Sequence, residues 1–265
     1  MPILNKDMTL CISLAGRPSN LGTRFHNYLY DELGLNFAYK AFTTNDIEGA
    51  LGIRGCSVSM PFKEAVIPLV DELTASAKAI DSVNTIVNSD GQLTAYNTDY
   101  EAIAALISRH ALDPAASVLV RGSGGMAKAV VAAFRDAGFA QLTVLARNEA
   151  VGRALADKYG YRWVRQDPPP GAEIIVNVTP LGMNGPEAGA LAFPLAHVAA
   201  ARTVFDVVAF PAETPLVRAA RAAGKPVISG AEVIALQAAR QFELYTGVRV
   251  TADQVERAAA FSRAG

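Results

Sequence analysis

The feature that most constrains this chain is the alternation of short β-like runs with helical patterns in its second part. Strand-like runs at 117–121, 142–146, 173–178 and 203–208 are interleaved with helical patterns that include 126–137 and 150–159. Strands joined through helices run parallel, because each crossover returns the chain to the same edge of the sheet. The pattern therefore predicts an α/β protein whose second part is a doubly wound parallel sheet.

The first hundred residues mix strands and helices less regularly. The predicted strands are 8–14, 37–42 and 55–60, followed by a hairpin of 83–87 and 92–96 with an Asp-Gly turn. Thr23 is expected to cap a helix that ends at Gly34, and a short helix is predicted at 46–51. Pro61 is expected to open another helix, with Lys63 in its first turn.

Composition narrows the possible partners. The 265 residues favour two domains, and 51% hydrophobic with 18% charged residues indicates buried cores rather than disorder. A formal charge of −1 gives no reason for nucleic acid or a membrane surface to bind. Two cysteines, no leader-like start and no long apolar run predict a cytoplasmic protein. The three histidines stand apart, so no metal site is predicted.

A glycine-rich turn follows the strand at 117–121 and precedes a helix. Its residues are Gly122, Ser123, Gly124, Gly125, Met126 and Ala127, a G-x-G-x-x-A arrangement. Such glycines allow a tight turn and a close approach of backbone to a pyrophosphate, while the helix N-terminus supplies free N–H groups. The sequence therefore predicts a Rossmann-type dinucleotide-binding domain, although a merely tight βα turn is the structural alternative.

The end of the next strand bears on the choice of dinucleotide. An acidic residue there would accept a hydrogen bond from the ribose of NAD, but the chain has Ala146-Arg147-Asn148. A guanidinium at Arg147 can pair with a 2′-phosphate and stack on adenine. NADP is therefore favoured over NAD.

Polar residues also gather at predicted strand ends in the first part of the chain. Lys63 could donate the proton that an alkoxide takes up after hydride reaches a ketone, and Asp99 could keep this ammonium charged and oriented. The simpler interpretation is a surface lysine and a helix-capping aspartate. Each residue taken alone leaves both interpretations open.

Several blocks in order resemble the shikimate dehydrogenase family over nearly the whole chain. They are S-x-S-x-P-F-K at 57–63, S-V-N-T at 82–85, N-T-D at 97–99, G-S-G-G-x-A at 122–127, N-V-T-P-L-G-M at 177–183 and S-G-A-E-V-I-A-L-Q at 229–237. The resemblance implies reversible, NADPH-dependent reduction of 3-dehydroshikimate to shikimate. It also implies an α/β substrate domain at 1–100, a Rossmann NADP domain at 101–236, and helices within 237–265 that return to the first domain.

The same resemblance implies roles for individual residues. Lys63 and Asp99 match the catalytic pair, Asn84 and Gln237 the ring-hydroxyl ligands, and Ser59 a usual threonine. The matched cofactor positions are Gly122, Ser123, Gly124, Gly125, Met126, Ala127, Arg147, Asn148, Asn177, Thr179 and Gly230. Gly182 lies with Asn177 and Thr179 in the block that flanks the cofactor, and Met183 and Gly230 are expected to face its nicotinamide side. Strand-end capping is the alternative for Asn177 and Thr179.

Two departures concern the substrate carboxylate. Family members hold it with two serines, whose positions fall here on Asn20 and Gly22, and a late tyrosine is replaced by Ala209. Losing such charge-assisted hydrogen bonds, worth roughly 1.5 to 3 kcal/mol each, weakens binding unless Arg17, Ser19, Thr23 or Arg24 substitutes. The pattern resembles the shikimate dehydrogenase-like subgroup, with an intact redox centre that is inefficient on shikimate or tuned to a related cyclic carboxylate.

Other functions remain open at this stage. A quinate/shikimate-type dehydrogenase with another substrate is one, and a noncatalytic nucleotide-sensing protein is another. A folate-linked methylene dehydrogenase shares the two-domain plan but not the motifs around Lys63 and Asp99. The protein is expected to be a monomer or a homodimer.

Overall fold

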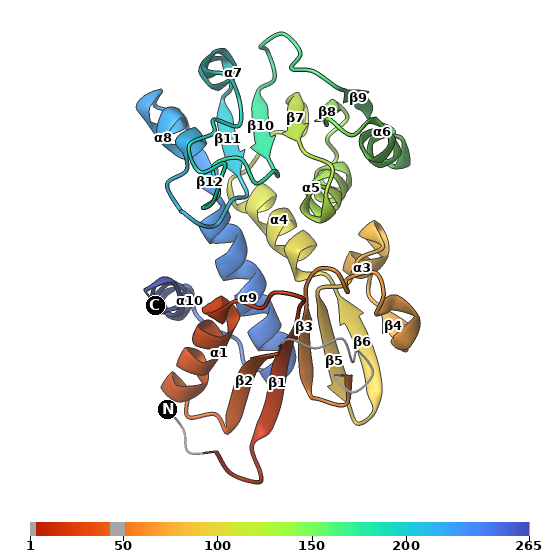
Figure 1. Cartoon of the computed structure of the whole chain (residues 1–265), viewed down its shortest axis with the longest axis vertical. Coiled ribbons are helices and arrows are strands. Elements are labelled where there is room, and N and C mark those ends of the chain that lie inside the picture. Colours follow the sequence, from red (N-terminus) through yellow and green to blue (C-terminus); the bar gives the residue numbers. More distant parts are fainter. Residues whose placement is uncertain (1–3, 43–50, 265) are drawn as a thin grey trace. The chain divides into compact units, whose positions relative to one another are not determined.

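The computed structural model describes residues 4–42 and 51–264, so all but Leu51 of the helix predicted at 46–51 lies outside the described residues. The chain forms two compact units (Figure 1). Unit 1 consists of Met1–Thr98 and Ala235–Gly265, and unit 2 of Asp99–Ile234. Among the described residues no helix is long and apolar enough to cross a membrane.

A six-stranded mixed sheet forms the centre of unit 1, in the order β2-β1-β3-β5-β6-β4. The strands are β1 (Thr9–Leu14), β2 (Phe37–Phe42), β3 (Gly55–Val58), β4 (Glu72–Leu73), β5 (Thr85–Ser89) and β6 (Gln92–Tyr96). β1 runs parallel to β2 and β3, whereas β5 runs antiparallel to β3 and β6. The predicted hairpin is confirmed, with Asp90 and Gly91 at φ of 54° and 94° in its turn.

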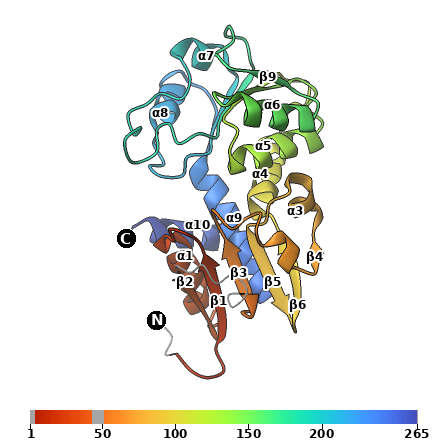
Figure 2. The same cartoon turned by 45° about the vertical axis from the view of Figure 1, so that its right-hand side comes forward.

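Three helices cover the part of this sheet nearest β1 and β2. They are α1 (Asn20–Glu32), the unit 1 part of α9 (Gly230–Thr246), and α10 (Ala252–Arg263), and Figure 2 shows α1 and α10 side by side. Phe25, Leu29 and Tyr30 of α1 share a core with Phe242 and Tyr245 of α9. A capping box between Thr251 and Gln254 begins α10.

Two predicted helix starts in unit 1 are wrong. The first helix begins at Asn20 rather than after Thr23, because Ser19 already takes the extended N-cap conformation. The helix expected from Pro61 is a series of turns that leads to a short 3₁₀ helix, Ile67–Leu69. Pro68 explains this difference, since it has no N–H for an α-helical hydrogen bond and its ring would clash with the carbonyl four residues earlier. α3 (Ala75–Ile80) follows.

Unit 2 contains a fully parallel six-stranded sheet in the order β12-β11-β10-β7-β8-β9. The strands are β7 (Val118–Arg121), β8 (Leu142–Leu145), β9 (Arg162–Val164), β10 (Ile174–Asn177), β11 (Thr203–Asp206) and β12 (Val227–Ser229). The helices are α4 (Thr98–Arg109), α5 (Gly125–Asp136), α6 (Glu149–Lys158), α7 (Leu195–Ala200) and α8 (Pro215–Ala222). The predicted α/β class and doubly wound Rossmann-type sheet are confirmed.

The helices of unit 2 divide between the two halves of its sheet. α5 packs along β7 and α6 along β8 and β9, while α8 packs along β11 and β12 (Figure 1). Sequence periodicity did not predict β9, β12, α7 or α8, which are all eight residues long or shorter. Short elements carry too few apolar repeats to be recognised in a sequence.

His26 is the most unusual polar residue of the unit 1 core. Its side chain is fully buried, and its ring stacks on Tyr39 at 4.5 Å between centroids and on Phe242 at 6.2 Å. Burial lowers the pKa of His26 to about 3, so the folded protein holds the neutral imidazole.

We therefore predict that His26 makes the protein less stable in mild acid. Between pH 6.5 and about 3 only the unfolded chain takes up a proton at this residue, so stability falls as pH falls. Denaturant unfolding should show a loss of about 2 kcal/mol from pH 7 to pH 5 that is absent in His26→Phe. Phe25→Leu, in the same core, should lower stability equally at both pH values, and an unchanged pH slope in His26→Phe would contradict the prediction.

Candidate functional site

The glycine-rich turn of unit 2 lies at the point where the strand order of the sheet reverses. β7 is followed in sequence by β8 on one side, and β10 pairs with its other side. Gly124 is the N-cap of α5, and a Cβ added at Gly124 or Gly125 would meet nothing within 4 Å. Open space above free helical N–H groups at a switch point fits a pyrophosphate. Ser123 and Met126 lie in the same turn, half-buried, and Ala127 is fully buried beneath it.

Gly122 is required for a different reason from Gly124 and Gly125. Its φ is +126°, and an added Cβ would lie 2.7 Å from Val178 Cγ2 and 3.1 Å from Thr179 Cγ2. The turn after β7 and the loop after β10 therefore approach each other closely only because residue 122 has no side chain.

The loop after β10 is held by a buried network. Asn177 is fully buried, and its Nδ2 donates to Leu181 O at 3.2 Å and to Asp206 Oδ1 at 3.0 Å. Its Oδ1 accepts from Thr179 N at 3.0 Å and Thr179 Oγ1 at 2.6 Å. The Asn177 side chain thus positions Thr179 and the loop that follows.

Asp206 completes this network from the end of β11. It is fully buried and also accepts from Val208 N and Thr214 Oγ1. Burial raises the pKa of its carboxyl, and the hydrogen bonds from Thr214, Val208 and Asn177 oppose that rise. Asp206 is therefore a structural anchor of unit 2.

Two further glycines of the matched motifs lie where a side chain would be too close to its neighbours. Gly182 has φ of +87°, and an added Cβ would lie 3.2 Å from both Thr214 and Pro215. A Cβ at Gly230, where α9 begins, would lie 2.3 Å from the Val208 carbonyl. Met183, after Gly182, is 45% exposed.

The residues expected to select the dinucleotide follow β8. Arg147 is exposed, and Asn148 caps α6 by accepting from Val151 N at 3.2 Å. The cap fixes where the helix begins, and Arg147 lies at the carboxyl edge of the sheet, after the strand that pairs with β7. These positions fit a dinucleotide with a phosphorylated ribose.

Thr98 is the centre of a second polar cluster, in unit 1. Asn84 Oδ1 accepts from Thr98 N at 2.7 Å, from Thr98 Oγ1 at 3.2 Å and from Thr85 Oγ1 at 2.9 Å. Thr98 Oγ1 also lies 3.3 Å from Gln237 Oε1. The amide oxygens of Asn84 and Gln237 both face Thr98. The groups that face away from Thr98 are therefore Nδ2 and Nε2, which are hydrogen-bond donors. The structure thus brings these two predicted ligands to one residue.

Lys63 lies in the turns after β3, and its carbonyl accepts from Val83 N at 2.9 Å. Asp99 directly follows Thr98 in the first turn of α4 and is 9% exposed. Ser59 is exposed just after β3, with its N–H bonded to Leu14 O at 2.9 Å. Asn20 is exposed and Gly22 half-buried, both in the first turn of α1.

Sequence reasoning missed three residues of this region. The sequence motifs indicate no role for Thr98 beyond its place before Asp99, and none for Gln241 or Ser57. Gln241 is 5% exposed, donates to Thr85 Oγ1 at 2.9 Å and accepts from Ser57 Oγ at 3.1 Å. Its spacing of four from Gln237 on one helix was the available signal.

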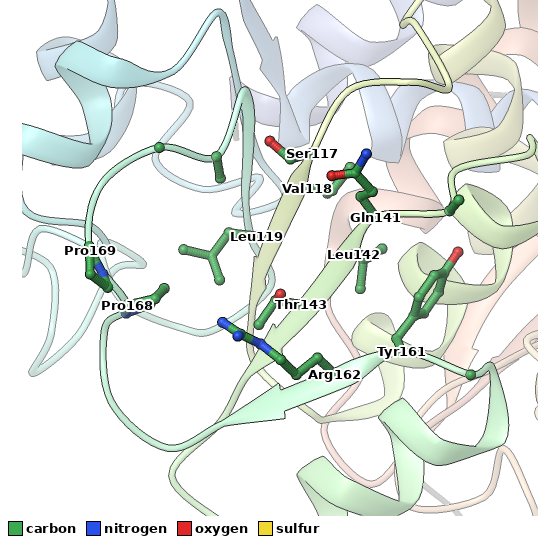
Figure 3. A pocket seen from close by; sticks show the side chains of 14 residues that line it. Ser117, Val118, Leu119, Gln141, Leu142, Thr143, Tyr161, Arg162, Pro168 and Pro169 are labelled. Carbon is green, nitrogen blue, oxygen red and sulfur yellow. The ribbon is translucent and has the colours of Figure 1, made fainter.

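A pocket of about 480 Å³ opens elsewhere in unit 2, near the beginnings of β7, β8 and β9 (Figure 3). Its lining includes Ser117, Gln141, Thr143, Tyr161, Arg162 and Pro168. None of the candidate cofactor residues lines it. Ligands of open α/β sheets bind at the carboxyl ends of strands, so this pocket is not the dinucleotide site.

These features define a two-unit α/β protein with a Rossmann dinucleotide-binding unit. A family model described as the shikimate dehydrogenase substrate binding domain matches residues 19–86. A shikimate dehydrogenase-like protein of Haemophilus influenzae is 58% identical and covers 98% of this chain and 99% of its own. A shikimate dehydrogenase (NADP(+)) of Oleidesulfovibrio alaskensis is 35% identical over 84% of each chain.

Solved structures agree with these sequence relatives. The crystal structure of shikimate 5-dehydrogenase from Thermus thermophilus, in complex with NADP(H) and shikimate, has 28% identity and a TM-score of 0.86. It covers 96% of this chain and 100% of that one. The chain belongs to the shikimate dehydrogenase family.

The different tasks of Gly122 and Gly124 give a prediction on stability. Gly122→Ala should lower the free energy of unfolding by at least about 2 kcal/mol, because the new Cβ meets Val178 and the backbone is left-handed. Gly124→Ala should cost less than about 1 kcal/mol, the loss of a glycine N-cap. Thermal unfolding of both variants measures the difference, and equal losses would contradict it.

Proposed function

We propose that this protein is an NADP-dependent oxidoreductase that interconverts shikimate and 3-dehydroshikimate, or a closely related cyclic hydroxy acid, and that it is inefficient on shikimate itself. The observation that carries the proposal is the orientation of Asn84 and Gln237 by Thr98, directly before Asp99. It presents two amide donors in the unit that also carries Lys63. Such donors suit the ring hydroxyls of a polyol acid.

The proposed chemistry needs one proton at one oxygen. NADPH supplies the hydride when bound, and the glycine-rich turn with Arg147 would hold it. Lys63 carries the proton on Nζ and gives it to the alkoxide oxygen that forms at the reduced carbonyl. Asp99 acts as the anionic partner that keeps the ammonium charged and directed. In the oxidative direction Lys63 takes the proton back from the hydroxyl.

The expected inefficiency on shikimate rests on α1. Asn20 and Gly22 stand where relatives are expected to have two serines, so the usual hydroxyl donors to a ring carboxylate are missing from the first turn of α1. A quinate-type dehydrogenase with another substrate is the nearest alternative. A noncatalytic nucleotide sensor is a second, although a sensor would not need a proton donor at Lys63.

Lys63→Ala tests the enzyme against the sensor. We expect kcat to fall about a thousandfold, because general acid–base catalysis contributes roughly 10² to 10⁴, while the Kd for NADPH stays within threefold. Lys78→Ala, an exposed lysine of the same unit, is the matched control and should leave both unchanged. If the parent protein turns over neither shikimate, quinate nor aminoshikimate, the sensor is favoured.

Arg147→Ala tests the choice of dinucleotide. Removing the guanidinium should raise the KM for NADPH at least tenfold and leave the KM for NADH nearly unchanged, because only NADPH carries the 2′-phosphate. Arg153→Ala, on the helix that follows Arg147, is the control, since Arg153 is already engaged with Glu149 at 2.8 Å and the Trp163 ring at 4.4 Å. Equal effects of Arg147→Ala on the two cofactors would contradict the assignment.

A further inference from the structure

The connection between β9 and β10 crosses the unit 2 sheet without a helix. β8 and β7 lie between these two strands in the sheet order, so residues 165–173, all of them described, must pass over both. Parallel crossovers usually carry an α-helix that covers the sheet. Here Pro168, Pro169 and Pro170 follow one another, and a proline inside a helix removes a hydrogen bond and clashes with the preceding turn. The connection therefore gives the strands below it no covering helix.

The pocket of Figure 3, here called the crossover pocket, lies between this connection and the sheet. Pro168 and Pro169 line one side of it, residues at the beginnings of β7, β8 and β9 line the other, and its volume is about 480 Å³. The connection is held at two adjacent residues, because Asp167 pairs with Arg121 of β7 and Pro168 O accepts from His197 Nε2 at 2.9 Å. The crossover pocket is thus built into the fold, and its size suits a small organic molecule.

A row of side chains across three strands forms the floor of the crossover pocket. Thr143 of β8 is in register with Leu119 of β7 and Arg162 of β9, and all three line the pocket. Register partners on parallel strands point to the same face of the sheet, and the strands are about 4.8 Å apart. Trp163 faces α6 instead, since an added Cβ at Gly152 of that helix would lie 2.4 Å from Trp163 Nε1. Arg162 therefore points away from α6, and in Figure 3 its side chain extends toward Thr143 and Leu119.

Arg162 is the only charged residue among the described residues that line the crossover pocket. Its guanidinium makes no hydrogen bond or ion pair with any other residue in the described part of the chain. The acidic residues that flank the lining are engaged elsewhere. Asp167 pairs with Arg121, and Glu173 Oε1 accepts from Arg202 Nη1 at 3.0 Å. The crossover pocket thus contains a positive charge without a counter-ion.

These groups favour a small organic carboxylate as the ligand. A guanidinium has two parallel N–H donors that match the two oxygens of a carboxylate, and the neighbouring Thr143 hydroxyl can donate to the same group. Phosphate fits less well, because phosphate sites commonly use a helix N-terminus and α5 and α6 begin at the opposite edge of the sheet. Leu119, Pro168 and Pro169 offer apolar contacts to a carbon body, and Gln141 offers a polar contact to a hydroxyl.

We propose that the crossover pocket is a second ligand site, which binds a small hydroxylated organic carboxylate through Arg162 and Thr143. The carboxylate pairs with the guanidinium and with the Thr143 hydroxyl, and the body of the acid lies between Leu119 and the prolines of the connection. This ligand site is distinct from the dinucleotide site, which lies at the carboxyl ends of the same strands. No lining residue of the crossover pocket belongs to the proposed redox site, so the two proposals are independent.

Calorimetric titration of the full chain tests the site with para-hydroxybenzoate and with para-hydroxybenzamide, its neutral counterpart of nearly the same shape. The wild type should bind the acid at least tenfold more tightly than the amide, because only the acid pairs its charge with Arg162. Arg162→Gln should weaken binding of the acid at least tenfold and leave binding of the amide within threefold. Thr143→Val, which keeps the shape of the side chain without its hydroxyl, should weaken the acid about fivefold.

Arg165→Ala is the matched control for Arg162→Gln. Arg165 is an exposed arginine three positions further along the same segment, and it does not line the crossover pocket. Its replacement should leave both Kd values unchanged. Inorganic phosphate, titrated as a third probe, should bind the wild type at least tenfold more weakly than the acid. All variants should keep the thermal unfolding midpoint of the wild type, as expected for side chains at the surface of a pocket.

Three results would overturn the proposal: a wild type that binds the acid no more tightly than the amide, an Arg162→Gln variant whose Kd for the acid is within twofold of the wild type, or an Arg165→Ala variant that weakens the acid equally. Phosphate that binds as tightly as the acid would overturn the assignment to a carboxylate. Absence of turnover with NADPH would refute the proposed oxidoreductase function and leave the Kd comparison at Arg162 unaffected.

Discussion

The hydrogen bonds between Thr98 and Asn84 are the interaction on which the candidate substrate site depends. They join the start of β5 to the start of α4, and the same threonine meets Gln237 of α9. Thr98 and Thr85 are fully buried, so unpaired polar groups here would cost free energy and the bonds must form. The orientation of the two amides proposed to bind substrate is therefore decided inside the core, not on the surface.

In unit 2 the main constraint is that the backbone must come close to an anion. Gly122 permits the approach of two loops, and Gly124 and Gly125 leave space above the start of α5. The buried carboxylate of Asp206 holds the neighbouring loop through Asn177 and Thr214. A charge is costly in such a place, and three hydrogen bonds offset that cost.

A group of hydroxyls lies beneath the first turn of α1. Asn20 and Gly22 of α1 have no hydroxyl, whereas hydroxyls from β1, β2 and β3 lie close together beneath Gly22. Together with Gln241 and Tyr245, they form one polar cluster in an otherwise aromatic core.

The sequence alone determined the parts that depend on local pattern. The strand–glycine–helix unit at 118–136, the hairpin turn at Asp90-Gly91 and the parallel order of the second sheet follow from periodicity and glycine placement, because these act within a few residues. Only the tertiary structure decided that Thr98 joins Asn84 to Gln237 and that Tyr39 lies under Gly22. Those contacts join residues between 14 and 139 positions apart, and side-chain chemistry at that separation has no periodic signal in a single chain.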